Sequence, residues 1–326
     1  MGIMISKNDF DGFVQFKNSK NFTLKTGRKE HLNKHNITTI KLSKLILKKK
    51  NQKKRNCLIC KSNNTKLIFK KKNFNHVKCE KCSFIYVNPI FKNEISHTTF
   101  LNENSYTKVL QNKNNIKLDK KKFQYGLQKI NIKKKEKSIL DFGCGFGAFL
   151  EIAKKQGWDV NGTELNKNCI KILKKKKINL LNIYNQNNKL FDAITLWTVL
   201  EHISDPDKLL KILIKKLKKN GKILFHVPNI NSLTAKILHE KCSMFSGEQH
   251  INFFSPLTLK KYLTQLGLKI ISLETIISDL GTIYNHLNFQ DPYLGNAKLS
   301  GIPFLDVDFI NRNLMGYTIL CVATKR

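Results

Sequence analysis

The sequence predicts an α/β fold in which a doubly wound, mostly parallel sheet carries helices on both faces. From position 138 onward, short apolar runs typical of buried strands alternate with segments of helical period. Helix capping signals separate the two kinds of segment. Asn166, Asp205 and Ser255 stand at N-cap positions, and a proline follows each of the last two. This alternation predicts parallel strands joined by crossover helices.

The expected strands follow one another at regular intervals. They cover residues 138–141, 159–164, 178–183, 191–198, 222–227, 268–273 and 317–324. The run 191–198 is strongly apolar, as expected of a central strand covered on both faces. Glycines at 157, 221 and 267 end the intervening helices. The chain of 326 residues is long enough for one such domain and a small accessory module.

The net charge is strongly positive, at +36, from 59 Lys and Arg against 23 Asp and Glu. Such a charge is typical of proteins with a nucleic-acid or anionic membrane partner. Only Arg28, Arg55, Arg312 and Arg326 are arginines, whereas base and phosphate recognition favours arginine. Abundant Lys, Asn and Ile together indicate a codon-composition bias instead. Nucleic acid stays an alternative partner.

No stretch approaches the roughly 20 apolar residues of a membrane span. The first residues, MGIMISKNDFDGF, lack the apolar core of a signal peptide. We therefore expect no transmembrane segment, a cytoplasmic location and reduced cysteines.

Four of the eight cysteines form two CxxC pairs, Cys57 with Cys60 and Cys79 with Cys82. Two-residue spacing lets both sulfurs of a knuckle reach one tetrahedral ion, and thiolates suit zinc. The alternatives are that the two CxxC pairs occur by chance or that the cysteines form disulfides. Disulfides are disfavoured in the cytosol. Four protein ligands leave no open position, so this four-cysteine zinc ribbon is expected to be structural. The other four cysteines are expected to be buried apolar residues.

These features divide the chain into four predicted parts. Residues 1–52 are polar and rich in lysine, which indicates a flexible or loosely packed extension. Residues 53–92 are the zinc ribbon, and 93–137 are one or two helices that link it to the main domain or cap its ligand site. Residues 138–326 are the α/β domain, in which 276–313 form an insertion of unassigned role.

A glycine turn follows the first strand of this domain. Gly143, Gly145 and Gly147 alternate directly after Asp141, in a strand–turn–helix context that lets backbone approach a ligand closely. Glu164 ends the second strand, where a carboxylate can accept hydrogen bonds from a ribose diol. The G-x-G-x-G spacing differs from the G-x-G-x-x-G typical of pyrophosphate binding. An acid at the turn suits a cationic, amino-bearing nucleoside ligand.

Through these and neighbouring motifs, residues 138–326 resemble the class I S-adenosylmethionine-dependent methyltransferases. The resemblance rests on the segments ILDFGCGFGAFL, VNGTELN, FDAITLWTVLEHISDPDKLL, LKKNGKILFHVPN and HINFFSPLTLKKYLTQLGLKII. With CLIC…VKCEKCSFIYVNP, the chain looks like zinc-ribbon methyltransferases of bacterial surface-sugar or small-molecule pathways. The resemblance implies a Rossmann-like sheet, mostly parallel with an antiparallel final strand, and covers about three-quarters of the chain.

The resemblance also implies cofactor roles for individual residues. Asp141 and the three alternating glycines would hold the methionine part, Glu164 the ribose hydroxyls, and Leu165 would pack beside the adenine. Trp197 and Thr198 would line the methyl-donor end. The family usually places an acid or amide after strand three for the adenine amine, and here that loop holds asparagines but no acid.

The acid–base candidates are His250, His202 and Glu248, with Glu201 beside His202. Histidine is the natural base near neutral pH, although His202 could equally be structural. Related sugar C-methyltransferases have Tyr-x-Glu-His where this chain has Gly247 to His250, so their mechanism does not transfer directly. Methyl transfer can rest largely on proximity and orientation.

The leading function is methylation of a small molecule, with a sugar nucleotide or glycan intermediate as the expected acceptor. The alternative is an RNA methyltransferase that grips phosphates with its ribbon and lysines. The segment 196–200, LWTVL, is not the Asn-Pro-Pro-Tyr or Asp-Pro-Pro-Tyr of enzymes that act on base amino groups, and no cysteine nucleophile follows strand four or five. A non-catalytic binding protein is disfavoured because the cofactor motifs are intact.

Overall fold

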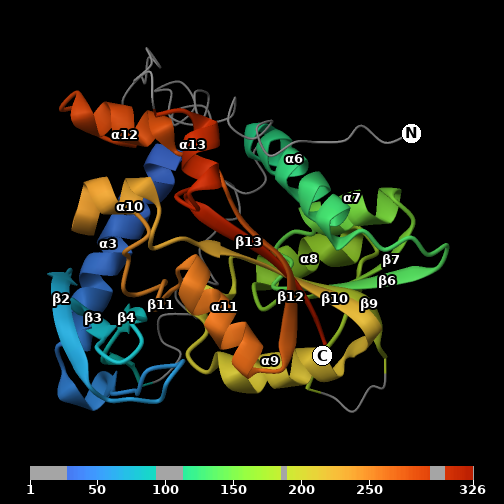
Figure 1. The fold of residues 1–326 in the computed structure, drawn as a ribbon, viewed down its shortest axis with the longest axis horizontal. Helices are drawn as coiled ribbons and strands as arrows, with labels where there is room; N and C mark the ends of the chain where they lie inside the picture. The colour runs from blue at the N-terminus through green and yellow to red at the C-terminus, as the bar shows by residue number, and fades with distance from the viewer. Residues whose placement is uncertain (1–27, 93–112, 185–188, 294–304, 326) are drawn as a thin grey trace.

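The computed structural model describes residues 28–92, 113–184, 189–293 and 305–325 (Figure 1). Its centre is a seven-stranded sheet in the order β12-β13-β10-β9-β6-β7-β8. The strands are β6 (Lys137–Phe142), β7 (Trp158–Thr163), β8 (Asn179–Leu180), β9 (Phe191–Trp197), β10 (Leu217–Pro228), β12 (Leu268–Ile276) and β13 (Thr318–Lys325).

The direction of the strands agrees with the prediction. Strands β10, β9, β6, β7 and β8 run parallel to one another. Strand β13 is antiparallel to both of its neighbours, β10 and β12. The chain order reverses between β6 and β9, and ligands of open α/β sheets bind at the carboxyl ends of strands beside such a point. The topology therefore places the predicted site residues that follow β6, β7 and β9 together at the carboxyl ends of these strands.

Helices cover both faces of this sheet (Figure 1). Apolar side chains of α6 (Lys113–Ile130), α7 (Ala148–Lys155) and α8 (Lys167–Lys175) form one core, and those of α9 (Pro206–Lys215) and α11 (Pro256–Gln265) form the other. All residues of β9 are buried, as its apolar sequence predicts. The predicted caps are confirmed, because the side chains of Asn166, Asp205 and Ser255 accept backbone N–H groups of their helices.

A second sheet lies beside the two CxxC segments, and of their cysteines only Cys79 belongs to one of its strands. Its order is β11-β4-β3-β2, from β2 (Thr65–Lys71), β3 (Phe74–Cys79), β4 (Ile85–Val87) and β11 (Asn252–Phe253). A short pair of β1 (Gln52–Lys53) and β5 (Ile90–Phe91) lies beside it. Strand β11 comes from the main domain, and its residues Asn252 and Phe253 pair with Tyr86 and Ile85. The ribbon and the main domain therefore share one sheet.

Within the predicted extension, residues 28–46 form helix α3 (Arg28–Ile46). Thr39, Leu42 and Ile46 are buried on one side of it, where they meet the ribbon and the segment before β11. The helix escaped prediction because lysines dilute this narrow apolar stripe. Residues 1–27 lie outside the described part of the chain.

The described parts of the remaining segments include several helices. In the predicted linker, 93–112 lie outside the described residues, and α6 packs against α7 and the sheet. After β10 come α10 (Leu233–Leu238) and the one-turn η4 (His239–Lys241). In the predicted insertion, α12 (Leu280–Leu287) and α13 (Val307–Arg312) form a small apolar cluster with α10.

No helix in the described ranges has the length and hydropathy to cross a membrane.

Candidate active site and metal centre

The glycine turn lies where the sequence places it, between β6 and α7. All three glycines have positive φ, and Gly145 is at 55°. A Cβ built on Gly145 would meet no atom within 4 Å, so the chain passes open space at this point. The Gly145 N–H donates to Oε2 of Glu164 over 2.7 Å. The turn and the acid after β7 are thus in direct contact.

Glu164 lies at the carboxyl end of β7, beside this open space, and accepts hydrogen bonds from the surrounding backbone. Its Oε1 accepts the N–H groups of Leu165 and Asn166, each over 2.7 Å. Three charge-assisted hydrogen bonds fix the carboxylate at the carboxyl end of β7. Leu165 is 76% exposed and presents an apolar side chain to solvent next to this acid. An apolar surface beside a fixed carboxylate suits a nucleoside, with its base on the leucine and its diol on the acid.

Asp141 lies under the turn. Its side chain is buried, and the Thr195 hydroxyl donates to Oδ1 over 2.7 Å. Burial raises the pKa of Asp141 to about 8. A cationic ligand at the turn would favour its ionised form.

Trp197 and Thr198 end β9 in different environments. Trp197 is buried between Phe123 and Phe149, with ring centroids 4.9 and 5.4 Å away, and its indole N–H has no hydrogen-bond partner among the described residues. Thr198 is exposed, has a φ of 52°, and its N–H donates to the His226 carbonyl over 2.8 Å. Of the two, Thr198 faces solvent at the carboxyl end of the sheet.

Two of the predicted acid–base residues meet in a cluster with Glu201. Glu201 and His202 belong to the one-turn helix η3 (Leu200–His202), and His250 immediately precedes the Ile251 that leads into β11. The imidazole rings of His202 and His250 are 4.7 Å apart, and His202 Nε2 lies 3.9 Å from Glu201 Oε1. Burial raises the pKa of Glu201 to about 8 and lowers that of His250 to about 4.

Glu248, the third acid–base candidate, points elsewhere. Its Oε1 accepts the Thr39 hydroxyl over 2.7 Å, which fastens helix α3 to the loop before His250. Gly247 precedes it with a φ of 80°, and a Cβ there would lie 2.5 Å from Cβ of Phe74. The ribbon thus occupies the space that a side chain at position 247 would need. This close approach explains a glycine at this position.

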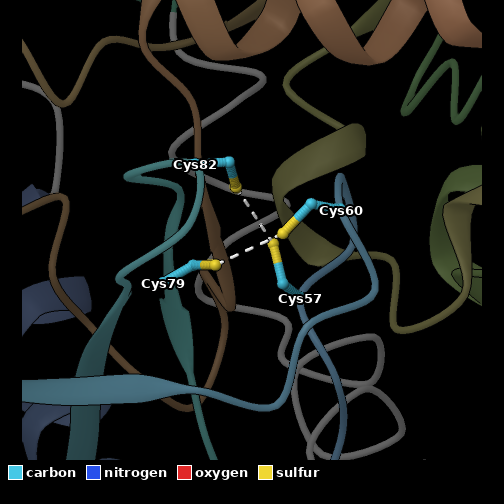
Figure 2. A group of neighbouring side chains, drawn as sticks. All are labelled: Cys57, Cys60, Cys79 and Cys82. Atoms are coloured by element: carbon cyan, nitrogen blue, oxygen red, sulfur yellow. Dashed lines mark hydrogen bonds between the residues drawn. The ribbon is translucent and has the colours of Figure 1, made fainter.

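The four cysteines of the CxxC pairs converge, as Figure 2 shows. Their sulfurs all lie within 4.8 Å of one another, with Cys57 Sγ 3.3 Å from Cys82 Sγ and Cys60 Sγ 3.4 Å from Cys79 Sγ. Tetrahedral zinc with Zn–S bonds of about 2.3 Å separates its sulfurs by about 3.8 Å. The cluster therefore fits one such ion after a small outward movement of the sulfurs.

Arg55 and Asn252 connect this centre to the histidine cluster, and neither was identified from the sequence. The Arg55 guanidinium donates to the carbonyls of Val87 and Ile251 and to Oδ1 of Asn252. The Asn252 amide donates to the carbonyls of Leu200, over 3.1 Å, and Ile203, over 2.8 Å, on either side of Glu201 and His202. That Arg55 is one of only four arginines in a lysine-rich chain was the only signal for this role.

Comparison with known proteins agrees with the geometry. Residues 118–273 match the family model described as a methyltransferase domain. The ubiquinone biosynthesis O-methyltransferase of Coxiella burnetii is 30% identical over 120 residues, which are 34% of this chain and 50% of that protein. The ubiquinone biosynthesis O-methyltransferase of Idiomarina loihiensis is 30% identical over 106 residues, which are 29% of this chain and 44% of that protein. The chain thus spans about half the length of the curated relatives it matches.

The fold has a solved counterpart. Phosphoethanolamine N-methyltransferase 2 of Haemonchus contortus, in complex with S-adenosyl-L-methionine, superposes with a TM-score of 0.51 at 18% identity, over 74% of this chain and 62% of that one. At this identity the likeness establishes the architecture. The chain has the Rossmann-like α/β fold of class I S-adenosylmethionine-dependent methyltransferases, and over residues 118–273 it is similar to their methyltransferase domain.

Proposed function

We propose that this protein transfers a methyl group from S-adenosylmethionine to a hydroxyl group of a small-molecule acceptor. The observation that carries the proposal is the contact of the glycine turn with Glu164 around open space at Gly145. Asp141 would attract the cationic methionine end of the cofactor. Glu164 would bind the ribose hydroxyls, and Leu165 would pack beside the adenine. The O-methyltransferase relatives support oxygen as the acceptor atom. A sugar nucleotide or glycan intermediate is the acceptor class we favour.

In this reaction the acceptor oxygen forms a bond to the methyl carbon while the carbon–sulfur bond breaks. S-adenosylhomocysteine leaves as a neutral thioether, and the acceptor hydroxyl loses its proton. The protein's own contribution would be orientation of the two substrates, in which Trp197 and Thr198 would line the methyl-donor end. His202 and His250 would act at the acceptor. Glu248 would act through the position of the His250 loop, because it is bonded to Thr39.

We also propose that Cys57, Cys60, Cys79 and Cys82 hold one structural zinc ion. Four thiolates complete a tetrahedral shell, so this ion would stabilise the ribbon sheet and take no part in methyl transfer. None of the eight cysteines forms a disulfide, which suits a reducing compartment such as the cytoplasm. Residues 53–92 and 138–326 would then work as one unit, joined through β11.

The test is calorimetric titration of the full chain with S-adenosylmethionine. Glu164→Gln keeps the shape of the side chain and removes its charge, and we expect the dissociation constant to rise by roughly tenfold or more, about 1.4 kcal/mol. Glu151→Gln is the matched control, because Glu151 is an exposed acid on α7 paired with Lys176. Equal affinity of both variants would refute the site. A labelled-methyl screen of sugar nucleotides, phenols, lipid-linked intermediates and total RNA then identifies the acceptor.

A further inference from the structure

The cluster of Glu201, His202 and His250 has the features of a metal site that is separate from the four cysteines. One donor atom of each residue lies within 4.8 Å of the donor atoms of the other two. Three donors at this spacing can reach a single ion. The residues come from two segments far apart in the sequence, so their convergence is a property of the fold.

Hydrogen bonds to the two imidazoles select the tautomer that metal binding needs. His202 Nδ1 lies 3.0 Å from the Gln249 carbonyl, and His250 Nδ1 lies 2.9 Å from the Met244 carbonyl. A carbonyl can only accept, so both Nδ1 atoms carry the proton in the neutral rings. The lone pair of each ring is then on Nε2. Metal-ligating histidines characteristically donate their other N–H to a backbone carbonyl in this way.

Glu201 supplies an independent observation. Its side chain is 1% exposed, and neither carboxylate oxygen has a hydrogen-bond partner in the described part of the chain. No lysine or arginine within the described ranges forms an ion pair with it. A buried carboxyl group without hydrogen bonds is costly, and native proteins rarely leave one. A cation held by the carboxylate and the two imidazoles would satisfy it.

The backbone around the cluster is held in place from both sides. The Ile251 N–H donates to the Glu201 carbonyl over 2.9 Å, and the Asn252 amide bonds the carbonyls on either side of Glu201 and His202. Val199, two residues before Glu201, has a side-chain carbon 3.0 Å from the Cβ position of Gly143 in the glycine turn. The cluster thus lies on a preorganised loop pair beside the proposed cofactor site.

We propose that Glu201, His202 and His250 bind one divalent cation of the zinc class. Two histidines and one carboxylate are a donor set that holds zinc with a fourth position open, whereas the four cysteines close their own shell. In this assignment the histidines are ligands, and the open position takes an oxygen of water or of the acceptor. An ion there would lower the pKa of a bound hydroxyl, whose proton passes to solvent. This last role rests on the proposed methyl transfer, but binding of the ion does not.

The experiment uses the full chain with one zinc ion per molecule in the cysteine centre, titrated calorimetrically with Zn²⁺ and, in parallel, spectroscopically with Co²⁺. We expect one further equivalent to bind, with cobalt bands of a nitrogen–oxygen site and no added thiolate charge-transfer band. Glu201→Gln and His250→Gln should each weaken this second event by roughly 100-fold. His286→Gln, on α12, is the matched histidine control and should leave it unchanged.

Thermal unfolding without added metal shows whether the variants fold. Glu201→Gln removes an unsatisfied acid and should not lower the melting temperature. Folded variants that bind the second ion as tightly as the wild type, or a wild type that binds none, would overturn the proposal. S-adenosylmethionine affinity of the same preparations is read separately. Loss of cofactor binding with an intact second metal event would refute the proposed function and leave the metal site standing.

Discussion

The open space at Gly145 permits a test that separates ligand binding from folding. Gly145 and Gly157 both have left-handed φ, 55° and 79°, and a Cβ at either would meet no atom within 4 Å. Gly157 lies just past the end of α7, away from the proposed site. Alanine at either position costs about 1–2 kcal/mol of folding free energy, because a side chain disfavours this backbone region. The two variants therefore form a matched pair for stability.

Only one of them places a methyl group in the proposed ligand space. We expect both Gly145→Ala and Gly157→Ala to lower the melting temperature by about 2–4 °C. Gly145→Ala should raise the dissociation constant for S-adenosylmethionine by roughly tenfold or more, about 1.4 kcal/mol, since the cofactor and the new methyl compete for one volume. Gly157→Ala should leave it unchanged. Calorimetry that shows full affinity in Gly145→Ala, or an equal loss in both, would refute the assignment.

Three further predictions concern other parts of the molecule. Asp141 keeps its proton in the folded state up to a pKa of about 8 but ionises near pH 4 when unfolded, so its contribution to stability is lost as pH rises from 4 to 8. Urea unfolding should show the wild type losing up to about 5 kcal/mol relative to Asp141→Asn across this window, and parallel pH profiles would contradict it. Removal of the zinc ion proposed for the four cysteines should speed hydrogen exchange in β3, β4 and β11 and spare the glycine turn, and mass spectrometry can resolve these segments. Faster exchange confined to the cysteine loops would argue that the ion does not stabilise the shared sheet. Thr39→Val should cost about 1 kcal/mol in thermal unfolding, because it removes the buried hydrogen bond to Glu248, and an unchanged melting temperature would mean that α3 is held by apolar contacts alone.

The sequence was most informative where one segment carries its own pattern. The mainly apolar run of β9, the capping residues Asn166 and Ser255, and the glycine turn each report local structure, and the structure has all of them. Sheet direction followed from the alternation of these elements. Such features depend on neighbours in the chain, and for that reason they can be recognised without a structure.

Long-range pairing was out of reach. Strand β11 has two residues, too few for a pattern, and exists because Asn252 and Phe253 meet the edge of β4. The cluster of His202 and His250 depends on that pairing. Glu201 was visible as a neighbour of His202, but the burial of its carboxylate, without a hydrogen bond from any described residue, is a tertiary property. Glu248 looked catalytic by proximity in sequence, and the fold turns it toward Thr39.

The pairing of β11 with β4 limits which zinc-binding segments could replace the ribbon in a chimeric protein. A zinc-binding segment borrowed from another chain would have to offer an edge strand in the same register and an arginine that reaches Ile251 and Asn252. Without both, a chimera would retain a folded α/β domain yet lose the support of the segment that carries His250. The two units are therefore expected to be inherited together, and a shortened chain that begins at residue 138 would lack the strand that pairs with β11.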